Sequence, residues 1–271
     1  MSQRALSFGA VAAAYERFRP GYSDELVDQV LAYAGGPVRT ALEIGAGTGK
    51  ATRLFARQGV AVTATDPDPA MLSELRRHVP ATVTPVQAAF EDLPLTAAYD
   101  LVFAAASLHW TKPYGRWARV AGMLARGGIF ASFGGQRELA DPDLRDSVEA
   151  VRSTYLADDD TPSPDGTSAD SPMQWPGTEL AASALFVDVR QSTIERRTTM
   201  AADDYVGHLS TVSAYLQLPE PVRREALDAI LEVLPARVEM VGDLRLHLAR
   251  LLGAPFAGRI PVNVATGWVA D

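Results

Sequence analysis

Hydrophobic and polar positions follow two alternating periods over residues 38–134. Short apolar runs typical of strands, such as RTALEI (39–44) and VAVTATD (60–66), are separated by segments with helical spacing, such as KATRLFARQ (50–58). YDLVFAAAS and GIFASFG continue the strand series. Strands that alternate with helices favour parallel pairing and right-handed crossovers. The pattern predicts an α/β fold, Rossmann-like and doubly wound, with a mostly parallel seven-stranded sheet and a helical insertion on the substrate side.

The pattern changes outside this region. Residues 5–34 read as helices split at Pro20-Gly21, and residues 156–178 are rich in Asp, Ser, Pro and Gly, which is typical of a flexible acidic loop. The predicted organisation is an N-terminal helical lid (1–37), a cofactor-binding core that includes the acidic loop (38–200), a helical insertion over the substrate site (201–252) and a final core strand (253–271).

Composition narrows the function classes. The chain has 271 residues, 47% of them hydrophobic, which is enough for a large core, and its net charge of -8 disfavours nucleic acid as a partner. It has no cysteine, and its four histidines are scattered, so no metal site is expected. No apolar run approaches the ~20 residues that cross a bilayer, and no signal peptide is evident. We therefore expect a cytoplasmic protein that does not bind membranes.

The glycine-rich stretch ALEIGAGTGKAT (41–52) is the main candidate for a ligand site. A Walker loop would need glycine where Ile44 stands and a hydroxyl residue where Ala51 stands, so a phosphate cradle for ATP is excluded. The dinucleotide fingerprint would need glycine at Lys50. Asp66, at the end of the second strand, suits the ribose of any adenosine ligand and does not discriminate.

A third ligand, S-adenosylmethionine, needs close backbone approach but no phosphate site. Gly45, Gly47 and Gly49 allow such an approach because glycine lacks a Cβ atom. Glu43, just before the first glycine, suits the ammonium group at the methionyl end of that ligand.

Several stretches in order resemble the class I S-adenosylmethionine-dependent methyltransferases. The resemblance rests on LEIGAGTG, TATDPDPAML, AAFEDLPL, YDLVFAAASLHWT and RVAGMLARGGIFASF, and covers residues 38–134. The front segment YERFRPGYSDEL is similar to a small-molecule subgroup that includes trans-aconitate-type methyltransferases. Many members have aspartate near Ala89; this sequence has Phe90 and Glu91 beside it. We expect Phe90 to stack on the adenine, with Glu91 or backbone groups supplying the polar contacts.

The resemblance implies a function and a set of site residues. It implies methyl transfer from S-adenosylmethionine to a small-molecule oxygen, nitrogen or carbon; the alternatives are a non-methylating S-adenosylmethionine-binding protein or an NAD-dependent oxidoreductase. Met71 covers the adenine or belongs to the core, and His109 is a catalytic candidate or a residue that holds its loop. The expected cofactor-binding residues are Tyr15, Arg19, Glu43, Gly45, Ala46, Gly47, Gly49, Asp66, Pro67, Met71, Ala89, Phe90, Glu91 and Ala105. The expected substrate-binding residues are Tyr22, Trp110, Trp175, Tyr205 and His208.

Overall fold

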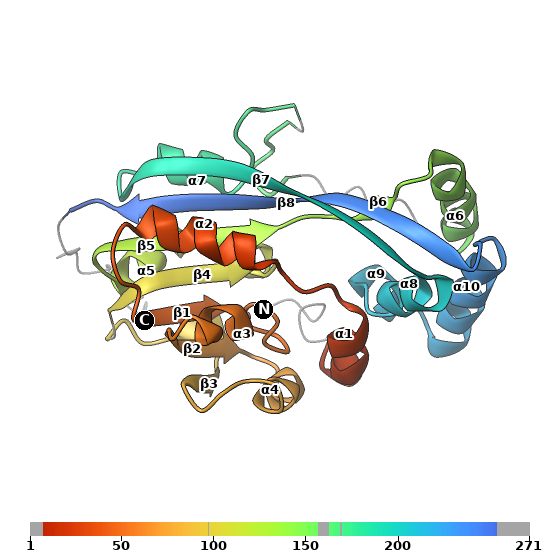
Figure 1. The fold of residues 1–271 in the computed structure, drawn as a ribbon, viewed down its shortest axis with the longest axis horizontal. Coiled ribbons are helices and arrows are strands. Elements are labelled where there is room, and N and C mark those ends of the chain that lie inside the picture. The colour runs from red at the N-terminus through yellow and green to blue at the C-terminus, as the bar shows by residue number, and fades with distance from the viewer. Residues whose placement is uncertain (1–7, 97, 157–162, 169, 254–271) are drawn as a thin grey trace, which may run out of the picture.

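A single twisted sheet organises the protein. The computed structural model describes residues 8–96, 98–156, 163–168 and 170–253, and within them the chain forms an eight-stranded sheet of order β3-β2-β1-β4-β5-β8-β6, with β7 paired along β8 (Figure 1). The strands are β1 (Thr40–Ile44), β2 (Ala61–Asp66), β3 (Val83–Gln87), β4 (Tyr99–Ala105), β5 (Leu124–Gly134), β6 (Glu138–Leu139), β7 (Phe186–Ala201) and β8 (Arg237–Leu251).

The pairing confirms the predicted doubly wound α/β class. Strands β1 to β5 pair in parallel, whereas β8 runs antiparallel to β5, β6 and β7. The sheet has one strand more than the seven predicted, because the short β6 also pairs with β8. The strand order reverses between β1 and β4, and in such sheets ligands bind at the carboxyl ends of the strands near this reversal.

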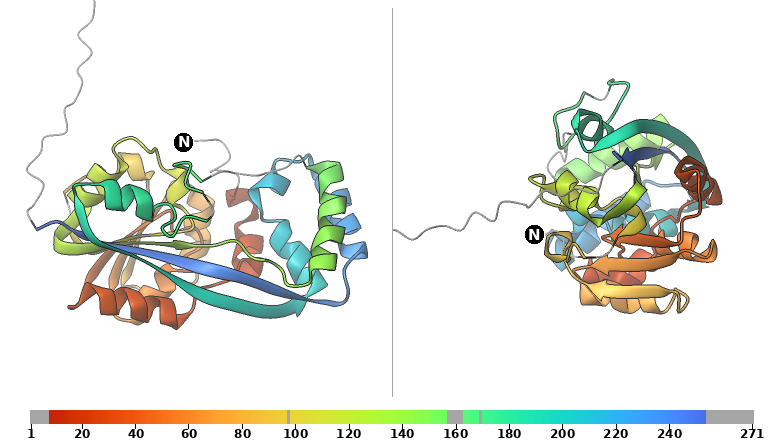
Figure 2. Two further views of the ribbon diagram at one scale, coloured as in Figure 1. Left: turned by 90° about the horizontal axis from the view of Figure 1, so that it is seen from above. Right: turned by 90° about the vertical axis from the view of Figure 1, so that its left-hand side faces the viewer.

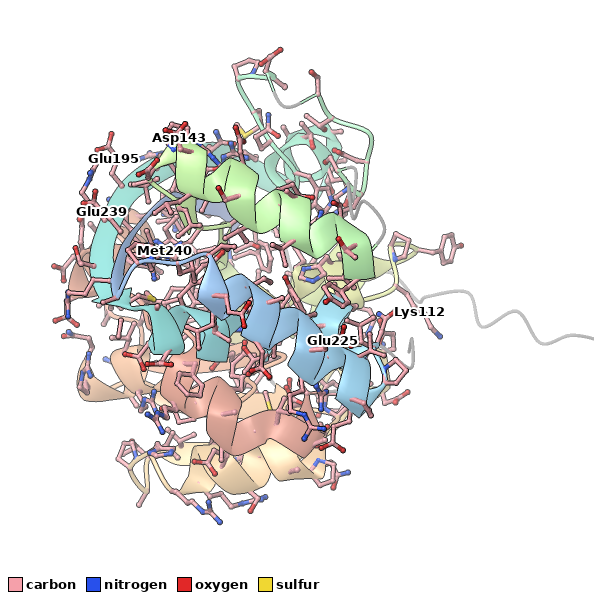
Figure 3. The ribbon with its side chains drawn as sticks, turned by 90° about the vertical axis from the view of Figure 1, so that its right-hand side faces the viewer. Lys112, Asp143, Glu195, Glu225, Glu239 and Met240 are labelled. Atoms are coloured by element: carbon pink, nitrogen blue, oxygen red, sulfur yellow. The ribbon has the colours of Figure 1, made fainter. Side chains whose placement is uncertain are left out.

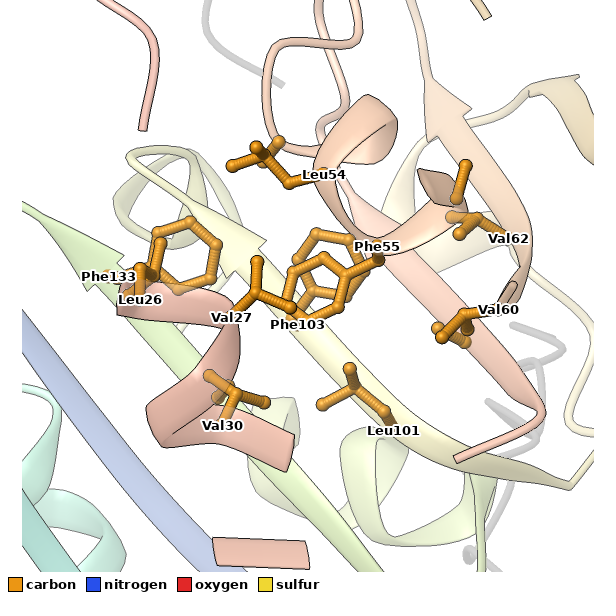
Figure 4. Packing of buried hydrophobic residues seen from close by; sticks show 14 of the residues in the cluster. Leu26, Val27, Val30, Leu54, Phe55, Val60, Val62, Leu101, Phe103 and Phe133 are labelled. Carbon is orange, nitrogen blue, oxygen red and sulfur yellow. The ribbon is translucent and has the colours of Figure 1, made fainter. Parts of the chain in front are cut away.

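Helices cover both faces of the parallel part. On one face α2 (Asp24–Ala34), α3 (Thr52–Arg57) and α4 (Pro69–Arg76) bury apolar side chains, with Phe55 and Phe103 in contact at 4.5 Å between ring centres (Figure 4). On the other face lie α5 (Arg116–Met123) and α7 (Gly177–Ala182). Because α2 packs into this core, only the part of the N-terminal segment before it remains as a cover for the site.

The long strands β7 and β8 extend beyond the parallel strands of the sheet and support a second group of helices (Figure 2). It contains α6 (Pro142–Tyr155), α8 (Ala202–Leu209), α9 (Ser213–Leu216) and α10 (Glu220–Glu232), with its own apolar core. Figure 3 shows α6 beside α10, where the Tyr155 hydroxyl donates to Glu225 Oε1 at 3.3 Å. None of the helices in the described ranges is long and apolar enough to span a membrane.

The helical insertion is shorter than the 201–252 range predicted. Its helices end at Glu232, and residues 237–251 form β8. In the middle of β8 successive residues 246–249 are all buried, because β5 and β7 flank the strand and both of its faces are covered. A strand buried on both faces loses its alternating pattern, so its sequence resembles that of a buried helix. The final strand predicted at 253–271 lies almost entirely outside the described residues.

Candidate functional site

The glycine turn after β1 is fixed to the end of β2. Its three glycines all have positive φ: 66° at Gly45, 55° at Gly47 and 84° at Gly49. The Ala46 amide donates to the Thr65 carbonyl at 2.8 Å, and the Gly47 amide donates to Asp66 Oδ2 at 2.9 Å. The turn and the carboxylate predicted to bind a ribose are therefore one hydrogen-bonded unit.

Packing inside the protein already requires two of these glycines. A Cβ atom on Gly45 would lie 2.6 Å from Ser107 Cβ, and one on Gly49 would lie 2.9 Å from Leu75 Cγ. The Ser107 hydroxyl donates to the Ile44 carbonyl across the same contact. At Gly47 the nearest atom is Met71 Cε at 3.3 Å, which places the buried Met71 beside the turn.

Asp66 is buried, with 9% of its surface exposed, and its two oxygens accept from the Gly47 and Asp68 amides, each at 2.9 Å. Burial raises the pKa of Asp66 to about 6. Asp68 caps α4, accepting from the Ala70 amide at 2.8 Å. Each Asp66 oxygen keeps a lone pair, because a carboxylate offers about four acceptor sites. The carboxylate can therefore accept further hydrogen bonds from a ligand.

A cavity of about 360 Å³ opens at the carboxyl ends of β1 and β4. Its walls come from the glycine turn, the segment after β5, the residues around α1 (Ala12–Phe18) and the helical group. It brings together many of the residues expected from the sequence: Tyr15, Arg19, Tyr22, Glu43, Gly45, Ala46, Gly47, Ala105 and His208.

Glu43 is the acidic group of this cavity. Only 1% of its surface is exposed, and the Thr52 hydroxyl donates to Glu43 Oε2. Burial raises the pKa of Glu43 to about 8, with nearby Asp66 adding to the increase. At neutral pH the side chain is therefore mostly protonated until a cation favours its ionised form.

Helix α1 is held on two sides. On one side Lys50 Nζ donates to the Glu16 carbonyl at 2.6 Å, and Arg53 Nη2 pairs with Glu16 Oε1 at 2.9 Å. On the other side Arg19 donates from Nε to Thr211 Oγ1 at 2.9 Å and from Nη2 to the Thr211 carbonyl at 2.8 Å. The segment therefore forms a wall between the glycine turn and the helical group. Lys50 is part of that wall, a role that its sequence position alone does not indicate.

Arg19 keeps donors for a ligand. A guanidinium group has five N–H donors, and the contacts with Thr211 use only part of them. The guanidinium lies 5.3 Å from the centre of the Tyr15 ring. Within the described ranges Arg19 makes no ion pair, so its charge remains available to an anion.

Comparisons with known proteins identify the fold that carries this site. Residues 42–132 match the family described as methyltransferase domain. A solved structure from Anaeromyxobacter dehalogenans, assigned as a type II methyltransferase, covers 88% of this chain and 100% of its own at 25% identity and a TM-score of 0.56. Residues 42–132 are therefore similar to a methyltransferase domain, within a fold shared with that solved structure.

Related proteins match this chain over only part of their own length. An uncharacterized methyltransferase of Mycobacterium tuberculosis is 42% identical over 124 residues, which are 45% of this chain and 49% of that protein. The trans-aconitate 2-methyltransferase of an Acidovorax species is 33% identical over 122 residues, 44% of this chain and 47% of that protein. The chain thus spans about half the length of these relatives.

A second, larger cavity of about 760 Å³ adjoins the first. Both cavities are lined by Ala106 and by residues 134–137 after β5. His109 and Trp175 line the larger cavity, and the exposed His109 ring lies 4.6 Å from that of Trp110. Glu91 Oε1 accepts from the Lys112 amide at 2.6 Å, so Glu91 holds the loop that carries His109.

Other expected residues lie away from the two cavities. Tyr205 is buried in the core of the helical group, and Phe90 is buried in the core under α5 with the Arg119 guanidinium 5.5 Å from its ring centre. Trp110 contacts Phe8, with 6.1 Å between ring centres, and lines neither cavity. Pro67 and Ala89 lie beside Asp66, whose carbonyl accepts from the Ala88 amide at 3.1 Å.

Several polar residues of the cavities were not expected from the sequence, among them His247, Arg137 and Arg196. His247 lines the larger cavity from β8. Its ring is hydrogen-bonded to Oε1 of Gln191 on β7 at 2.9 Å, and burial lowers its pKa to about 4. Arg137 and Arg196 line the smaller cavity. Arg137 follows the Gly134-Gly135 pair at the end of a predicted strand, a position that could have singled it out; Arg196 lies on a strand with no comparable signal.

Proposed function

We propose that this protein is a methyltransferase that transfers a methyl group from S-adenosylmethionine to a small molecule. The observation that carries the proposal is the cavity at the carboxyl ends of β1 and β4, which joins Glu43 and Arg19 beside a turn fixed by Asp66. It lies in a chain whose residues 42–132 match the methyltransferase domain.

The polar groups in and beside the cavity fit S-adenosylmethionine. Asp66 lies beside the cavity rather than in its lining, bonded to Gly47 of the turn, and it has acceptor capacity for the two ribose hydroxyls. Arg19 lines the cavity and has free donors for the carboxylate. Glu43, once ionised, suits the ammonium group. The fold also supports S-adenosylmethionine as the cofactor. When it is bound, this cofactor supplies an electrophilic methyl group on its sulfonium. The residues of the chain bind it, orient it and exclude water.

The larger cavity is the proposed site of the methyl acceptor. It shares Ala106 and residues 134–137 with the smaller cavity, so an acceptor in one can reach a group held in the other. Walls from β8, the Trp175 segment and the loop of His109 suit a small molecule rather than a polymer. Reacting atoms must approach to roughly 3–3.5 Å in line, which the small residues Ala106, Gly134 and Gly135 in the shared wall permit.

The proposed function is tested by incubating the protein with S-adenosylmethionine and a fractionated metabolite extract. Small molecules that gain one CH₂ in mass, together with an equal amount of S-adenosylhomocysteine, are the expected products. A chain that binds S-adenosylhomocysteine but yields no methylated product from any fraction would instead be a cofactor-binding protein without transfer activity.

Cofactor binding is expected to release protons at neutral pH. Burial raises the pKa of Glu43 to about 8, and the side chain must lose its proton to accept a hydrogen bond as a carboxylate from the ammonium group. Affinity should therefore strengthen from pH 6 to 8, by up to about tenfold per unit. Calorimetry of S-adenosylhomocysteine binding at pH 7, in two buffers with different ionisation heats, should show release of about one proton. Glu43→Gln should remove the buffer dependence; equal heats for the wild type in both buffers would contradict this role.

His109 is the proposed acceptor of a proton from the substrate. It lies on the rim of the larger cavity, on a loop held by Glu91. His109→Gln is expected to lower kcat by about 10²-fold, the lower end of the usual contribution of a general base. The affinity for S-adenosylhomocysteine should stay within about twofold. An unchanged kcat would restrict His109 to holding its loop.

A further inference from the structure

Two half-buried arginines carry buried nitrogen atoms without hydrogen-bond partners. Arg137 Nε and Nη2, and Arg196 Nε, are buried and make no hydrogen bond within the described residues. Neither guanidinium forms an ion pair there, although Asp243 acts on Arg196 at longer range. Such atoms are uncommon, because a buried donor without an acceptor loses its bonds to water and gains none in return.

Their surroundings add to this cost. Burial lowers the pKa of both guanidinium groups, and the charge of Arg196 further lowers the pKa of Arg137. Two like charges that face each other in a partly dry region destabilise the folded chain. Unfavourable polar arrangements of this kind often mark sites that serve a ligand rather than stability.

The two residues lie where the cavities meet. Arg137 lines both cavities, from the segment after β5, and Arg196 lines the smaller one from β7, where it pairs with Gly242 of β8. His208 also lines the smaller cavity. Burial lowers its pKa to about 4, and the charges of Arg19 and Arg137 contribute to this decrease. His208 is therefore neutral and does not add to the positive charge.

The acidic groups nearby do not neutralise this cluster. Glu138, on the rim of the larger cavity, pairs with Arg145 at 2.5 Å. Asp243 is largely exposed. The single carboxylate of the cofactor accounts for Arg19 under the proposed function, which leaves two guanidinium groups for another anion.

We propose that Arg137 and Arg196 form an anion-binding subsite that holds a carboxylate or phosphate group of the methyl acceptor. The inference rests on the proposed function, because it places the acid group of the acceptor at the junction of the two cavities, where Arg137 lines both and Arg196 lines the smaller one. It makes the substrate an acidic small molecule, and it assigns substrate specificity to these two residues. Guanidinium groups suit such anions because their planar N–H pairs match carboxylate and phosphate oxygens.

The test measures anion binding to the protein saturated with S-adenosylhomocysteine. Calorimetric titrations use citrate as the carboxylate probe, inorganic phosphate as the phosphate probe and trimethyl citrate as the uncharged control. We expect citrate or phosphate to bind and the triester not to bind. The probe with the higher affinity indicates whether the acid group of the substrate is a carboxylate or a phosphate. Arg137→Gln and Arg196→Gln should each weaken that binding at least about tenfold, while the affinity for S-adenosylhomocysteine changes less than about twofold.

Arg197→Gln is the matched control. Arg197 follows Arg196 on β7, is exposed and pairs with Glu239 at 2.8 Å, so its loss should leave anion binding unchanged. A second readout separates a ligand site from a structural role. Without anion, Arg137→Gln and Arg196→Gln should melt at the same temperature as the wild type or higher, because each removes a half-buried charge that forms no ion pair within the described residues.

Three results would overturn the inference. The first is no anion binding by the wild type, or equal binding by the two Gln variants. The second is a lower melting temperature in both variants, which would show that the arginines stabilise the fold. The third is a parallel loss of S-adenosylhomocysteine affinity, which would assign them to the cofactor. Failure of the wild type to bind S-adenosylhomocysteine would instead count against the proposed function itself.

Discussion

Gly45→Ala is expected to destabilise the protein by about 2–5 kcal/mol. The positive φ of 66° at Gly45 costs an L-residue about 1–2 kcal/mol. The new Cβ would lie 2.6 Å from Ser107 Cβ, and overpacking of this kind costs about 1–3 kcal/mol more. Because Ser107 must move, its bond to the Ile44 carbonyl is lost as well.

Gly59→Ala is the matched control for this substitution. Gly59 also has a positive φ, 82°, but a Cβ atom there would meet no other atom within 4 Å. Only the backbone strain remains, about 1–2 kcal/mol. In thermal melts Gly45→Ala should therefore lose roughly 5–15 °C and Gly59→Ala only a few degrees. Equal losses would show that the approach of Ser107 to the turn is not a tight contact.

Local sequence signals predicted the sheet, and they singled out the glycine turn and the acidic residue to which it is hydrogen-bonded. The turn after β1 and the acidic residue that ends β2 are each defined within a few residues, and their spacing limits how they can meet. The same holds for Asp68, whose position before a proline predicts a helix cap. In these cases the local chemistry and the fold require the same residues.

Contacts between distant segments could not be predicted in this way. The sequence predicts Arg19 as a cofactor-binding residue, but its hydrogen bonds to Thr211, 192 residues away, are visible only in the folded chain. Side chains along β7 point alternately to the two faces of the sheet, and nothing in the local sequence indicates that the face with Arg196 lines a cavity. Phe90 illustrates the opposite case: an aromatic residue beside an expected adenine site is instead buried in the core under α5.

Asp66→Ala is expected to weaken the binding of S-adenosylhomocysteine by at least about 100-fold. The substitution removes the acceptor for the ribose hydroxyls, and hydrogen bonds to a charged group contribute about 1.5–3 kcal/mol each. It also leaves the Gly47 and Asp68 amides without their side-chain acceptor, so the turn itself loosens. Asp66→Asn keeps one acceptor oxygen without the charge and should lie between Asp66→Ala and the wild type.

Asp100→Ala separates loss of the ligand contact from general loss of stability. Asp100 lies at the opposite end of the sheet, where its Oδ2 accepts from the Arg39 amide at 2.8 Å and the Thr40 amide at 3.0 Å. It therefore resembles Asp66 in fixing two backbone amides, but it lies away from both cavities. Its loss should lower the melting temperature and leave cofactor affinity nearly unchanged.

The most direct test of a cofactor site at the glycine turn is a calorimetric titration of S-adenosylhomocysteine into the wild type, Asp66→Ala and Asp100→Ala under one set of conditions. We predict binding to the wild type, at least about 100-fold weaker binding to Asp66→Ala, and an affinity for Asp100→Ala within about threefold of the wild type. A wild type that gives no binding heat, or an Asp66→Ala variant that binds as the wild type does, would contradict the site.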